Sequence, residues 1–254
     1  MSEMDHIRFT AATFEKSGPP EDMRIEVEKT RRAGEIGRAT GLFRVPAVLD
    51  FDEAKGLAVF ERIKDMEDLR ALARSGRDLS PLAERIGRAV AAVHRDLTLP
   101  ADMVKPLPPE FSDEGHDVFL HGDLSVENVV VDRADGSLVI IDWRMTGVHG
   151  GRATYGCRYF DILWLVNNLV WSPTVRHFFG DPVRPVARSF VESYFRAAGL
   201  PFDREGFRRY AERFFEVKLP LRGLDSRRNR LFIPRGRALS RRFIRAVESE
   251  YFHD

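Results

Sequence analysis

The sequence has few features that would point to a compartment or to a class of partner. Cys157 is the single cysteine in 254 residues, which excludes an internal disulfide and a metal site built from several cysteines. Its neighbours, Gly156 and Arg158, form no nucleophile signature, so we expect a structural thiol. The 40 Lys and Arg residues nearly balance the 39 Asp and Glu residues, so net charge does not indicate nucleic-acid binding.

Long hydrophobic runs are also absent. The first ten residues, MSEMDHIRFT, lack the apolar core of a signal peptide. The most apolar run, FDILWLVNNLVW at residues 160–171, is too short and too polar to span a bilayer. We therefore expect a cytoplasmic protein, long enough to bury the core of one large domain or of two lobes.

The first 63 residues have the pattern of a small α/β lobe. Residues 6–17, HIRFTAATFEKS, are of β type and predict a strand that ends at the following Gly-Pro-Pro. Acidic Glu21 and Asp22 then mark the first turn of a helix, which we expect to end at Gly41. The segments VPAVLDFD and GLAVFERI flank DEAKG and predict a β-hairpin.

The rest of the chain is predicted to be mainly helical. Ser80 and Pro81 are suited to cap and begin a helix, and apolar side chains follow them at helical spacing. Residues 187–195 and 207–214 carry aromatic stripes with the same spacing, which we expect to lie in the core.

One segment in this helical part, residues 119–143 (FLHGDLSVENVVVDRADGSLVIIDW), has a different pattern. VVVD and SLVIID predict two strands, and the loop RADG between them contains Asp-Gly, a strong hairpin signal. Asn128 lies seven residues before Asp135 and Asp142 lies seven after it, so we expect them side by side at the open end of the hairpin. Asp123, five residues before Asn128, lies on a short loop that we expect to return to the same end of the hairpin.

Three convergent side chains that carry oxygen suit a magnesium site. Mg²⁺ binds one or two carboxylates and leaves room for substrate phosphates, so Asn128 and Asp142 are candidate ligands. Asp123 would then accept a proton from a hydroxyl nucleophile, as phosphoryl transfer requires. The alternative is that Asp and Asn only cap the strand ends. His-Gly before Asp123 and Trp after Asp142 favour the site.

The motif H-G-D-L-x-x-x-N, followed by a hairpin and I-D-W, resembles the aminoglycoside phosphotransferase and choline kinase-like family. The resemblance is weaker over the rest of the chain. It implies an α+β, two-lobed protein-kinase-like fold. Residues 1–63 would form the small nucleotide-binding lobe. Residues 64–254 would form the helical lobe, with the catalytic loop at 121–128 and the metal-binding hairpin at 128–142.

The resemblance also implies roles for single residues. Asp123 would be the catalytic base, and Asn128 and Asp142 would be the Mg²⁺ ligands. His121 would brace the loop, and Asp161, in YFDILWL, would support the loop from a helix. The alternative for Asp161 is that it caps its own helix.

A second kinase-like motif, His94-Arg95-Asp96-Leu97, lies on the helix that begins near Ser80. Ala101 stands five residues after Asp96, where the catalytic loop needs asparagine, and no hairpin follows. We expect Asp96 to be a solvated residue at the helix end and His94 to be packed.

A kinase-like small lobe needs a strand lysine paired with a helix glutamate to hold the nucleotide phosphates. Lys16 and Glu26 are the best candidates, and Glu28 competes with Glu26 for the helix position. Both could instead be ordinary surface residues. The linker from Glu61 to Ile63 is the candidate hinge for the adenine of ATP, and GTP is possible.

The glycine-rich phosphate loop of such families is missing. It lies on a hairpin before the lysine strand, yet the first glycine here is Gly18, after Lys16. Either the small lobe is abbreviated, or other groups cover the phosphates, or nucleotide binding is impaired.

The family's acceptors are hydroxyl groups of small molecules. Residues 222–254 contain nine arginines and four acidic residues, which favours an anionic acceptor such as a phosphorylated sugar or a lipid headgroup. The alternative is that the arginines are the solvated face of a helix whose apolar stripe is buried. A basic amphipathic helix could also contact a membrane surface.

The sequence therefore favours a Mg-ATP-dependent kinase that acts on a hydroxyl of a small molecule. A second possibility is a catalytically silent kinase-like protein that binds nucleotide or a partner. The missing glycine loop favours it, whereas the complete set of Asp123, Asn128 and Asp142 does not. The third is a protein kinase, against which the His-Gly-Asp spelling and the lack of Ala-Pro-Glu after Asp142 both weigh.

Overall fold

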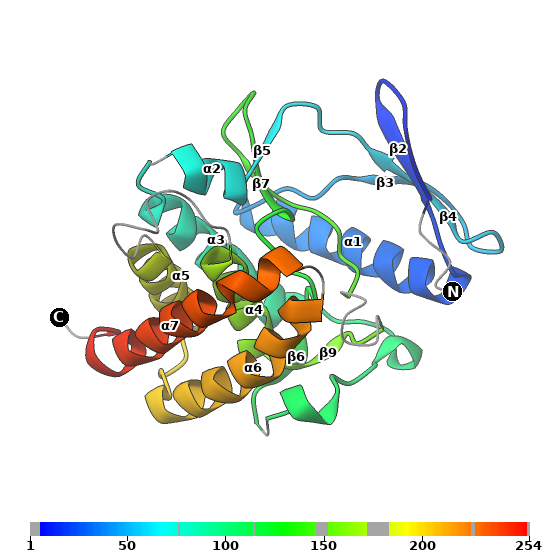
Figure 1. The fold of residues 1–254 in the computed structure, drawn as a ribbon. Helices are drawn as coiled ribbons and strands as arrows, with labels where there is room; N and C mark the ends of the chain where they lie inside the picture. The colour runs from blue at the N-terminus through cyan, green and yellow to red at the C-terminus, as the bar shows by residue number, and fades with distance from the viewer. Residues whose placement is uncertain are drawn as a thin grey trace.

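The protein has a small part built on an antiparallel sheet and a larger helical part, which lie beside each other (Figure 1). The predicted α+β class is therefore confirmed. The structure is a computed structural model that describes residues 6–75, 77–113, 115–145, 152–171, 183–224 and 227–252.

The sheet of the small part has four strands in the order β1-β2-β4-β3, all antiparallel to their neighbours. One helix, α1, packs Met23 and Val27 against Ala58 and Phe60 of the sheet. As predicted, α1 begins with acidic residues and ends at Gly41, which has a φ of 66°. The element bounds are β1 His6–Phe9, β2 Thr13–Ser17, α1 Pro20–Thr40, β3 Val48–Asp52 and β4 Leu57–Glu61.

Residues 6–17 form two strands, and the prediction of one strand is wrong. The turn between β1 and β2 is closed by Thr10, whose Oγ1 accepts hydrogen bonds from the backbone N–H groups of Ala12 and Thr13. A threonine side chain thus replaces the Gly or Pro by which a sequence usually shows such a turn. Lys16 on β2 is therefore preceded by a hairpin whose turn contains no glycine.

The helical part is built around long apolar helix faces. The aromatic stripes lie in the core as predicted: Phe190, Tyr194, Phe207 and Phe214 are all buried. Helix α3 begins at Ser80, so the N-cap position belongs to Leu79 and the predicted capping role of Ser80 is wrong. The helix bounds are α2 Leu69–Ser75, α3 Ser80–Asp96, α4 Tyr159–Val170, α5 Val183–Ala198, α6 Arg204–Leu224 and α7 Arg227–Ser249, with short 3-10 turns at Ala101–Met103 and Pro109–Phe111.

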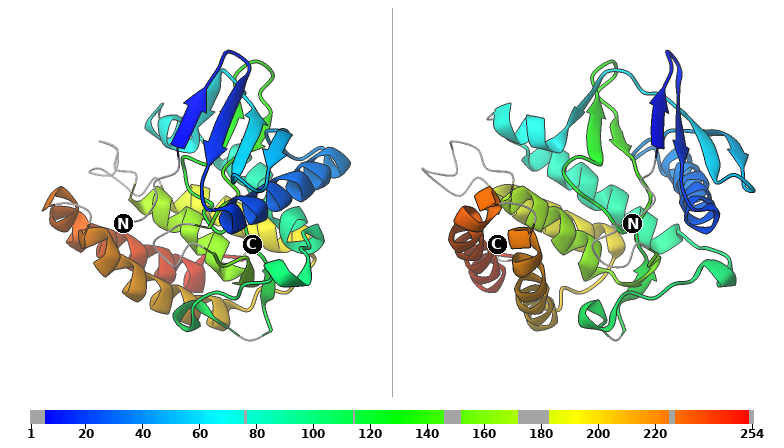
Figure 2. Two further views of the ribbon diagram at one scale, coloured as in Figure 1. Left: turned by 90° about the vertical axis from the view of Figure 1, so that its right-hand side faces the viewer. Right: turned by 45° about the vertical axis from the view of Figure 1, so that its right-hand side comes forward.

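Two small sheets accompany the helices. The three-stranded sheet, of order β5-β7-β8, contains the predicted hairpin, which stands beside the first sheet in Figure 2. Arg44, just after α1, pairs its backbone with Leu138 and Ile140 of this hairpin and so ties the two parts together. The bounds are β5 Met66–Asp68, β6 Asp117–Phe119, β7 Val129–Asp132, β8 Leu138–Ile140 and β9 Tyr155–Cys157, and β6 pairs with β9.

The single cysteine agrees with the sequence. Cys157 is buried on β9, and this burial raises the pKa of its thiol to about 12, as suits a structural cysteine. No helix within the described ranges is long and apolar enough to cross a membrane.

The closest packing of α3 against α5 can be tested at Gly87. A Cβ atom there would lie 2.6 Å from the carbonyl oxygen of Phe190, so Gly87→Ala must push the helices apart. We expect it to lower the free energy of unfolding by about 1–3 kcal/mol, measured by urea denaturation. In the matched control, Gly34→Ala in α1, the new methyl group meets only ordinary contacts at 3.6 Å and should stabilise by about 0.5–1 kcal/mol. Equal effects of the two substitutions would contradict this account of the packing.

Candidate active site

The β7–β8 hairpin forms as predicted, but its register differs by one residue. The Ile141 N–H donates to the Asn128 carbonyl at 3.0 Å, so Asn128 lies opposite Ile141 and Asp142 lies one residue beyond. The loop has four residues, Arg133 to Gly136, and is centred between Ala134 and Asp135, so counting from Asp135 misplaces one strand. Both Asn128 and Asp142 still border one pocket.

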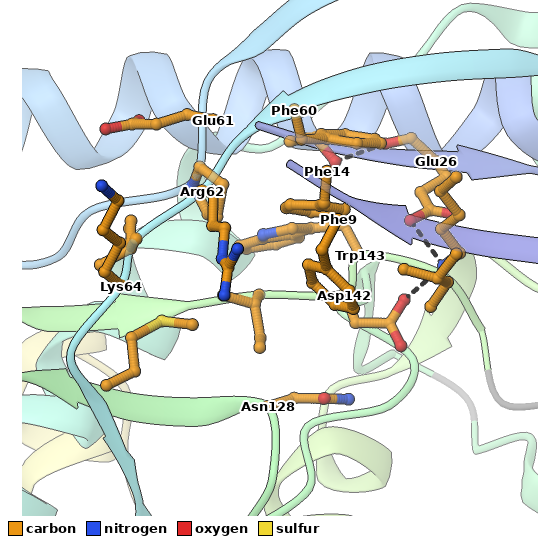
Figure 3. A pocket seen from close by; sticks show the side chains of 17 residues that line it. Phe9, Phe14, Glu26, Phe60, Glu61, Arg62, Lys64, Asn128, Asp142 and Trp143 are labelled. Atoms are coloured by element: carbon orange, nitrogen blue, oxygen red, sulfur yellow. Dashed lines mark hydrogen bonds and ion pairs between the residues drawn. The ribbon is translucent and has the colours of Figure 1, made fainter. Parts of the chain in front are cut away.

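Lys16 joins the small part to this hairpin. Its Nζ lies 2.8 Å from Glu26 Oε1 on α1 and 2.9 Å from Asp142 Oδ1, as the dashed lines of Figure 3 show. The competing residue, Glu28, pairs instead with Arg32 at 2.6 Å. The structure therefore brings Asp142 to Lys16 and Glu26, although Asp142 lies 126 residues after Lys16 in the sequence.

The electrostatics keep this lysine charged. Burial alone would lower the pKa of Lys16, but the two carboxylates outweigh burial and hold the pKa above its ordinary value. Asp142, in contrast, is exposed and has a positive φ of 57°, an unusual conformation for a residue other than glycine. Such strain, held by Lys16 and by the hairpin, is typical of functional positions.

Asp123 lies next to Asn128 and is half-buried. The amide Nδ2 of Asn128 donates to the Asp123 carbonyl at 2.9 Å and lies 3.3 Å from its Oδ2. The indole Nε1 of Trp164 donates to Oδ1 at 2.7 Å. Burial, with the nearby charge of Asp142, raises the pKa of the Asp123 carboxyl to about 6, so it is mostly ionised at neutral pH and able to accept a proton.

Asp161 holds the loop that carries Asp123. It is fully buried, and its two carboxylate oxygens accept hydrogen bonds from the backbone N–H of His121 at 2.7 Å and of Gly122 at 2.9 Å. Its side chain thus points to the loop, and no cap bond to its own helix is formed. Although burial opposes the charge, these bonds and His94 keep the pKa of Asp161 below its ordinary value.

The second kinase-like motif behaves as predicted, with one addition. Asp96 is exposed at the end of α3 and pairs with Arg95, while His94 is packed. The addition is that His94 Nε2 lies 3.0 Å from Asp161 Oδ2, and its Nδ1 lies 2.9 Å from the Tyr194 hydroxyl. This motif is therefore not a catalytic loop, but its histidine supports the loop through Asp161.

His121 and Lys29 fix the start of the same loop. His121 Nδ1 accepts the N–H of Asp123 and its Nε2 lies 3.1 Å from the Ile141 carbonyl, which links the loop to the hairpin. Burial lowers the pKa of His121 to about 4, so the ring is neutral at pH 7. Lys29, fully buried on α1, donates to the His121 carbonyl at 2.7 Å, and burial lowers its pKa to about 8.

A cavity of about 390 Å³ lies between the first sheet and the hairpin. Glu26 and Asp142 stand at one end, Glu61 and Lys64 at the other, and aromatic rings lie between them (Figure 3). The N–H and C=O groups of Ile63 form no hydrogen bond with any described residue, so they are available to a ligand. Phe9, 62% exposed, borders the same cavity.

The donor set fits a magnesium ion that also binds phosphates. Asn128 uses its amide nitrogen towards Asp123, which leaves its amide oxygen for a cation, and Asp142 keeps Oδ2 beyond its bond to Lys16. In Figure 3 the amide group of Asn128 points toward the side of the pocket on which Asp142 stands. Among the described residues, no group of three His, Cys, Asp or Glu side chains could hold a metal ion.

Four residues of this region were not identified from the sequence as parts of the site: Lys29, His94, Trp164 and Lys218. Two of them could have been found from the sequence, because each is a lysine on the apolar face of a helix. Lys29 lies four residues after the buried Ile25 of α1, and Lys218 follows Phe214 at the end of an aromatic stripe.

The arginines of the C-terminal segment give no further support for an anionic acceptor site. Leu239, Phe243, Val247 and Tyr251 are buried, as expected for an apolar helix stripe. On the other faces of α7, Arg235 is half-buried and four arginines are exposed, and none of the five borders the cavity between the sheet and the hairpin: Arg235, Arg237, Arg241, Arg242 and Arg245. The side chains of the remaining arginines up to residue 230 lie outside the described part.

The role of Asp161 in holding the loop can be tested by its amide variant. Asp161→Asn removes the charge that faces His94 and places an amide NH₂ group against a loop N–H. We expect the free energy of unfolding, measured by urea denaturation, to fall by roughly 3 kcal/mol. The control, Asp96→Asn, changes an exposed carboxylate at the end of α3, and its effect should stay within about 0.5 kcal/mol. A tolerated Asp161→Asn would show that the loop does not depend on this carboxylate.

A model of the phosphotransferase enzyme family matches residues 60–212, more than half of the chain. No curated protein matches the sequence.

Several solved structures share the fold. A choline/ethanolamine kinase family protein from Mesorhizobium loti is 16% identical, with 97% of this chain and 90% of that chain covered and a TM-score of 0.53. The choline kinase LicA from Streptococcus pneumoniae is 14% identical, with 98% and 91% covered and a TM-score of 0.53. A GDP complex of an aminoglycoside 2'-phosphotransferase IIIa mutant is 12% identical, with 98% and 91% covered and a TM-score of 0.54.

At these identities the structures show the fold alone, which is the predicted two-lobed, kinase-like fold. The match to the family model adds the family. The chain belongs to the phosphotransferase enzyme family.

Proposed function

We propose that the protein is a Mg²⁺-dependent phosphotransferase that moves the γ-phosphoryl group of ATP to a hydroxyl of a small molecule. The observation that carries the proposal is the bridge from Lys16 to Glu26 and Asp142, at the end of a cavity that also borders Asn128. We assign nucleotide binding to residues 1–63 and place the catalytic loop and the hairpin within residues 64–254.

The two ends of the cavity suit the two ends of a nucleotide, its base and its phosphates. The free N–H and C=O groups of Ile63, beside Glu61, match the donor and acceptor pattern of a purine edge. A purine there would cover the exposed side chains of Ile7 and Phe9, which border the cavity. Lys16 would bind the phosphates with its ammonium group, held in place by Glu26.

When bound, Mg²⁺ would neutralise charge on the phosphates, and Asn128 and Asp142 would hold it. Asp123 would orient the acceptor hydroxyl and take its proton as the oxygen attacks the γ-phosphorus. A new P–O bond to the acceptor forms while the bond between the γ-phosphorus and the bridging oxygen breaks, and ADP leaves. His121 and Asp161 would keep the loop in position.

The proposal also names the class of the donor nucleotide and of the acceptor. We propose ATP as the donor. GTP is the alternative donor, because an aminoglycoside phosphotransferase of the same fold was solved with GDP. For the acceptor we propose a small-molecule hydroxyl compound, because the neighbours include choline kinases and an enzyme solved with kanamycin. Anionic hydroxyl compounds are to be tested beside cationic and neutral ones, and we propose neither nucleic acid nor a membrane as partner.

One observation favours the catalytically silent alternative. The hairpin before Lys16 turns at Thr10, Ala11 and Ala12, and the described residues ahead of Lys16 contain no glycine to cover the phosphates closely. Measurement of nucleotide binding separates this alternative from the kinase.

Binding of Mg-ATP should depend on Asp142. We expect calorimetry to show magnesium-dependent binding by the wild type, weakened at least about 10-fold in Asp142→Asn because a carboxylate ligand is lost. Asp135→Asn, at the other end of the same hairpin and more than half exposed, should bind like the wild type. The absence of binding at millimolar nucleotide would reject the kinase and favour the silent protein.

Phosphoryl transfer should depend on Asp123 more than nucleotide binding does. We expect Asp123→Asn to bind Mg-ATP normally and to transfer phosphate roughly 10²–10⁴-fold more slowly, because its amide cannot accept the acceptor's proton. The measurement is ³¹P NMR of ATP consumption with a panel of cationic, neutral and anionic hydroxyl compounds. Equal rates for the variant and the wild type would exclude Asp123 as the base.

A further inference from the structure

The Asp123 carboxylate is held from the side of the helical part by Trp164. The indole Nε1–H of Trp164 donates to Oδ1 at 2.7 Å, which is short for such a bond. Oδ2 has only a longer contact, 3.3 Å, with the Asn128 amide. The two oxygens of this carboxylate therefore differ: Oδ1 is engaged by a strong donor, and Oδ2 keeps capacity for another hydrogen bond.

Trp164 is in turn covered by a buried cation. The Nζ of Lys218, on α6, lies 3.4 Å from the centroid of the Trp164 ring, and the residue is only 3% exposed. A lysine in such a place is costly, because its ammonium loses water. The position continues the stripe of Phe207 and Phe214, where an apolar residue would suit the packing better.

The position of Lys218 lets its charge strengthen the hydrogen bond from Trp164 to Asp123. A positive charge on the face of an indole ring draws electron density from it and makes the N–H at its edge a stronger donor. Here the edge N–H points at Asp123, and the positive charge of Lys218 also acts on that carboxylate through space.

The same helix holds the catalytic loop twice. Asp161 binds the backbone of His121 and Gly122, and Trp164, one turn later on α4, binds the side chain of Asp123. Helix α4 therefore sets both the backbone position of the loop and the orientation of the Asp123 carboxylate. A carboxylate that must face one hydroxyl group needs such a rigid support.

We propose that Trp164 and Lys218 are positioning residues for phosphoryl transfer: together they fix the Asp123 carboxylate through Oδ1 and leave Oδ2 to the acceptor hydroxyl. This inference rests on the proposed function. It does not depend on the identity of the acceptor or of the nucleotide.

The hydrogen bond can be tested without any substrate. The chain has three tryptophans, so a ¹H–¹⁵N spectrum should show three indole signals, and Trp164→Phe assigns the one from Trp164. We expect that signal to lie downfield and to move upfield in Asp123→Asn and in Lys218→Met, while the other two indole signals stay in place. A Trp164 signal that does not respond to Asp123→Asn overturns the proposal.

Kinetics test whether this contact serves the reaction. We expect Trp164→Phe, which keeps the ring but loses the N–H, to lower kcat for ADP release from Mg-ATP roughly 10- to 100-fold, with KM for ATP unchanged. Lys218→Met should lower kcat as well, and Lys218→Arg should restore part of the loss. The control is Trp171→Phe at the C-cap of the same helix, since the Trp171 indole N–H has no partner among the described residues; its kcat should match the wild type.

The outcomes distinguish a failure of the positioning role from a failure of the proposed function. If kcat falls equally in Trp164→Phe and in Trp171→Phe, the effect is one of packing and the positioning role is wrong. If the wild type neither binds nor turns over Mg-ATP, the proposed function fails, and the indole signals still decide whether Trp164 and Lys218 hold Asp123.

Discussion

The buried carboxylate of Asp161 is the interaction on which the arrangement of the site depends. It lies where α3, α4 and the loop at residues 121–128 meet, and it accepts two loop N–H groups as well as a contact from His94. A buried charge is costly unless every oxygen is satisfied, so this carboxylate tolerates only one placement of the loop. Asp123 and Asn128 follow directly from that placement, because they stand two and seven residues after His121.

The small part is aligned with the helical part through charges carried by α1 and β2. Lys16 reaches from β2 to Glu26 and to Asp142 of the hairpin, and Lys29 reaches from α1 to the carbonyl of His121. Both lysines are buried, so a displacement of α1 would leave ammonium groups without partners in an apolar setting. The position of α1 is thus coupled to that of the loop at residues 121–128, and a ligand that binds between the parts meets groups already in place.

Much of the fold and of the candidate site was accessible from the sequence, because the signals were local. The α1 boundaries, the hairpin of β3 and β4 and the aromatic helix faces follow from caps, turns and periodicity. The H-G-D-L-x-x-x-N motif pointed to the family, and the pairing of Lys16 with Glu26 followed from the resemblance. The turn at Thr10 was missed because a threonine hydroxyl closes it, and the β7–β8 register was one residue off because the loop centre was misplaced.

The sequence by itself determined the helices, most of the strands and the residues that could carry chemistry, since these depend on neighbours within a few positions along the chain. Only the tertiary structure decided that His94 contacts Asp161, that Lys29 binds the loop and that Lys218 covers Trp164 beside Asp123. Each of these contacts joins residues more than fifty positions apart, and in each a polar group is buried. Burial makes such a partner obligatory, whereas which residue provides it follows from how the helices pack and leaves no periodic pattern in the sequence.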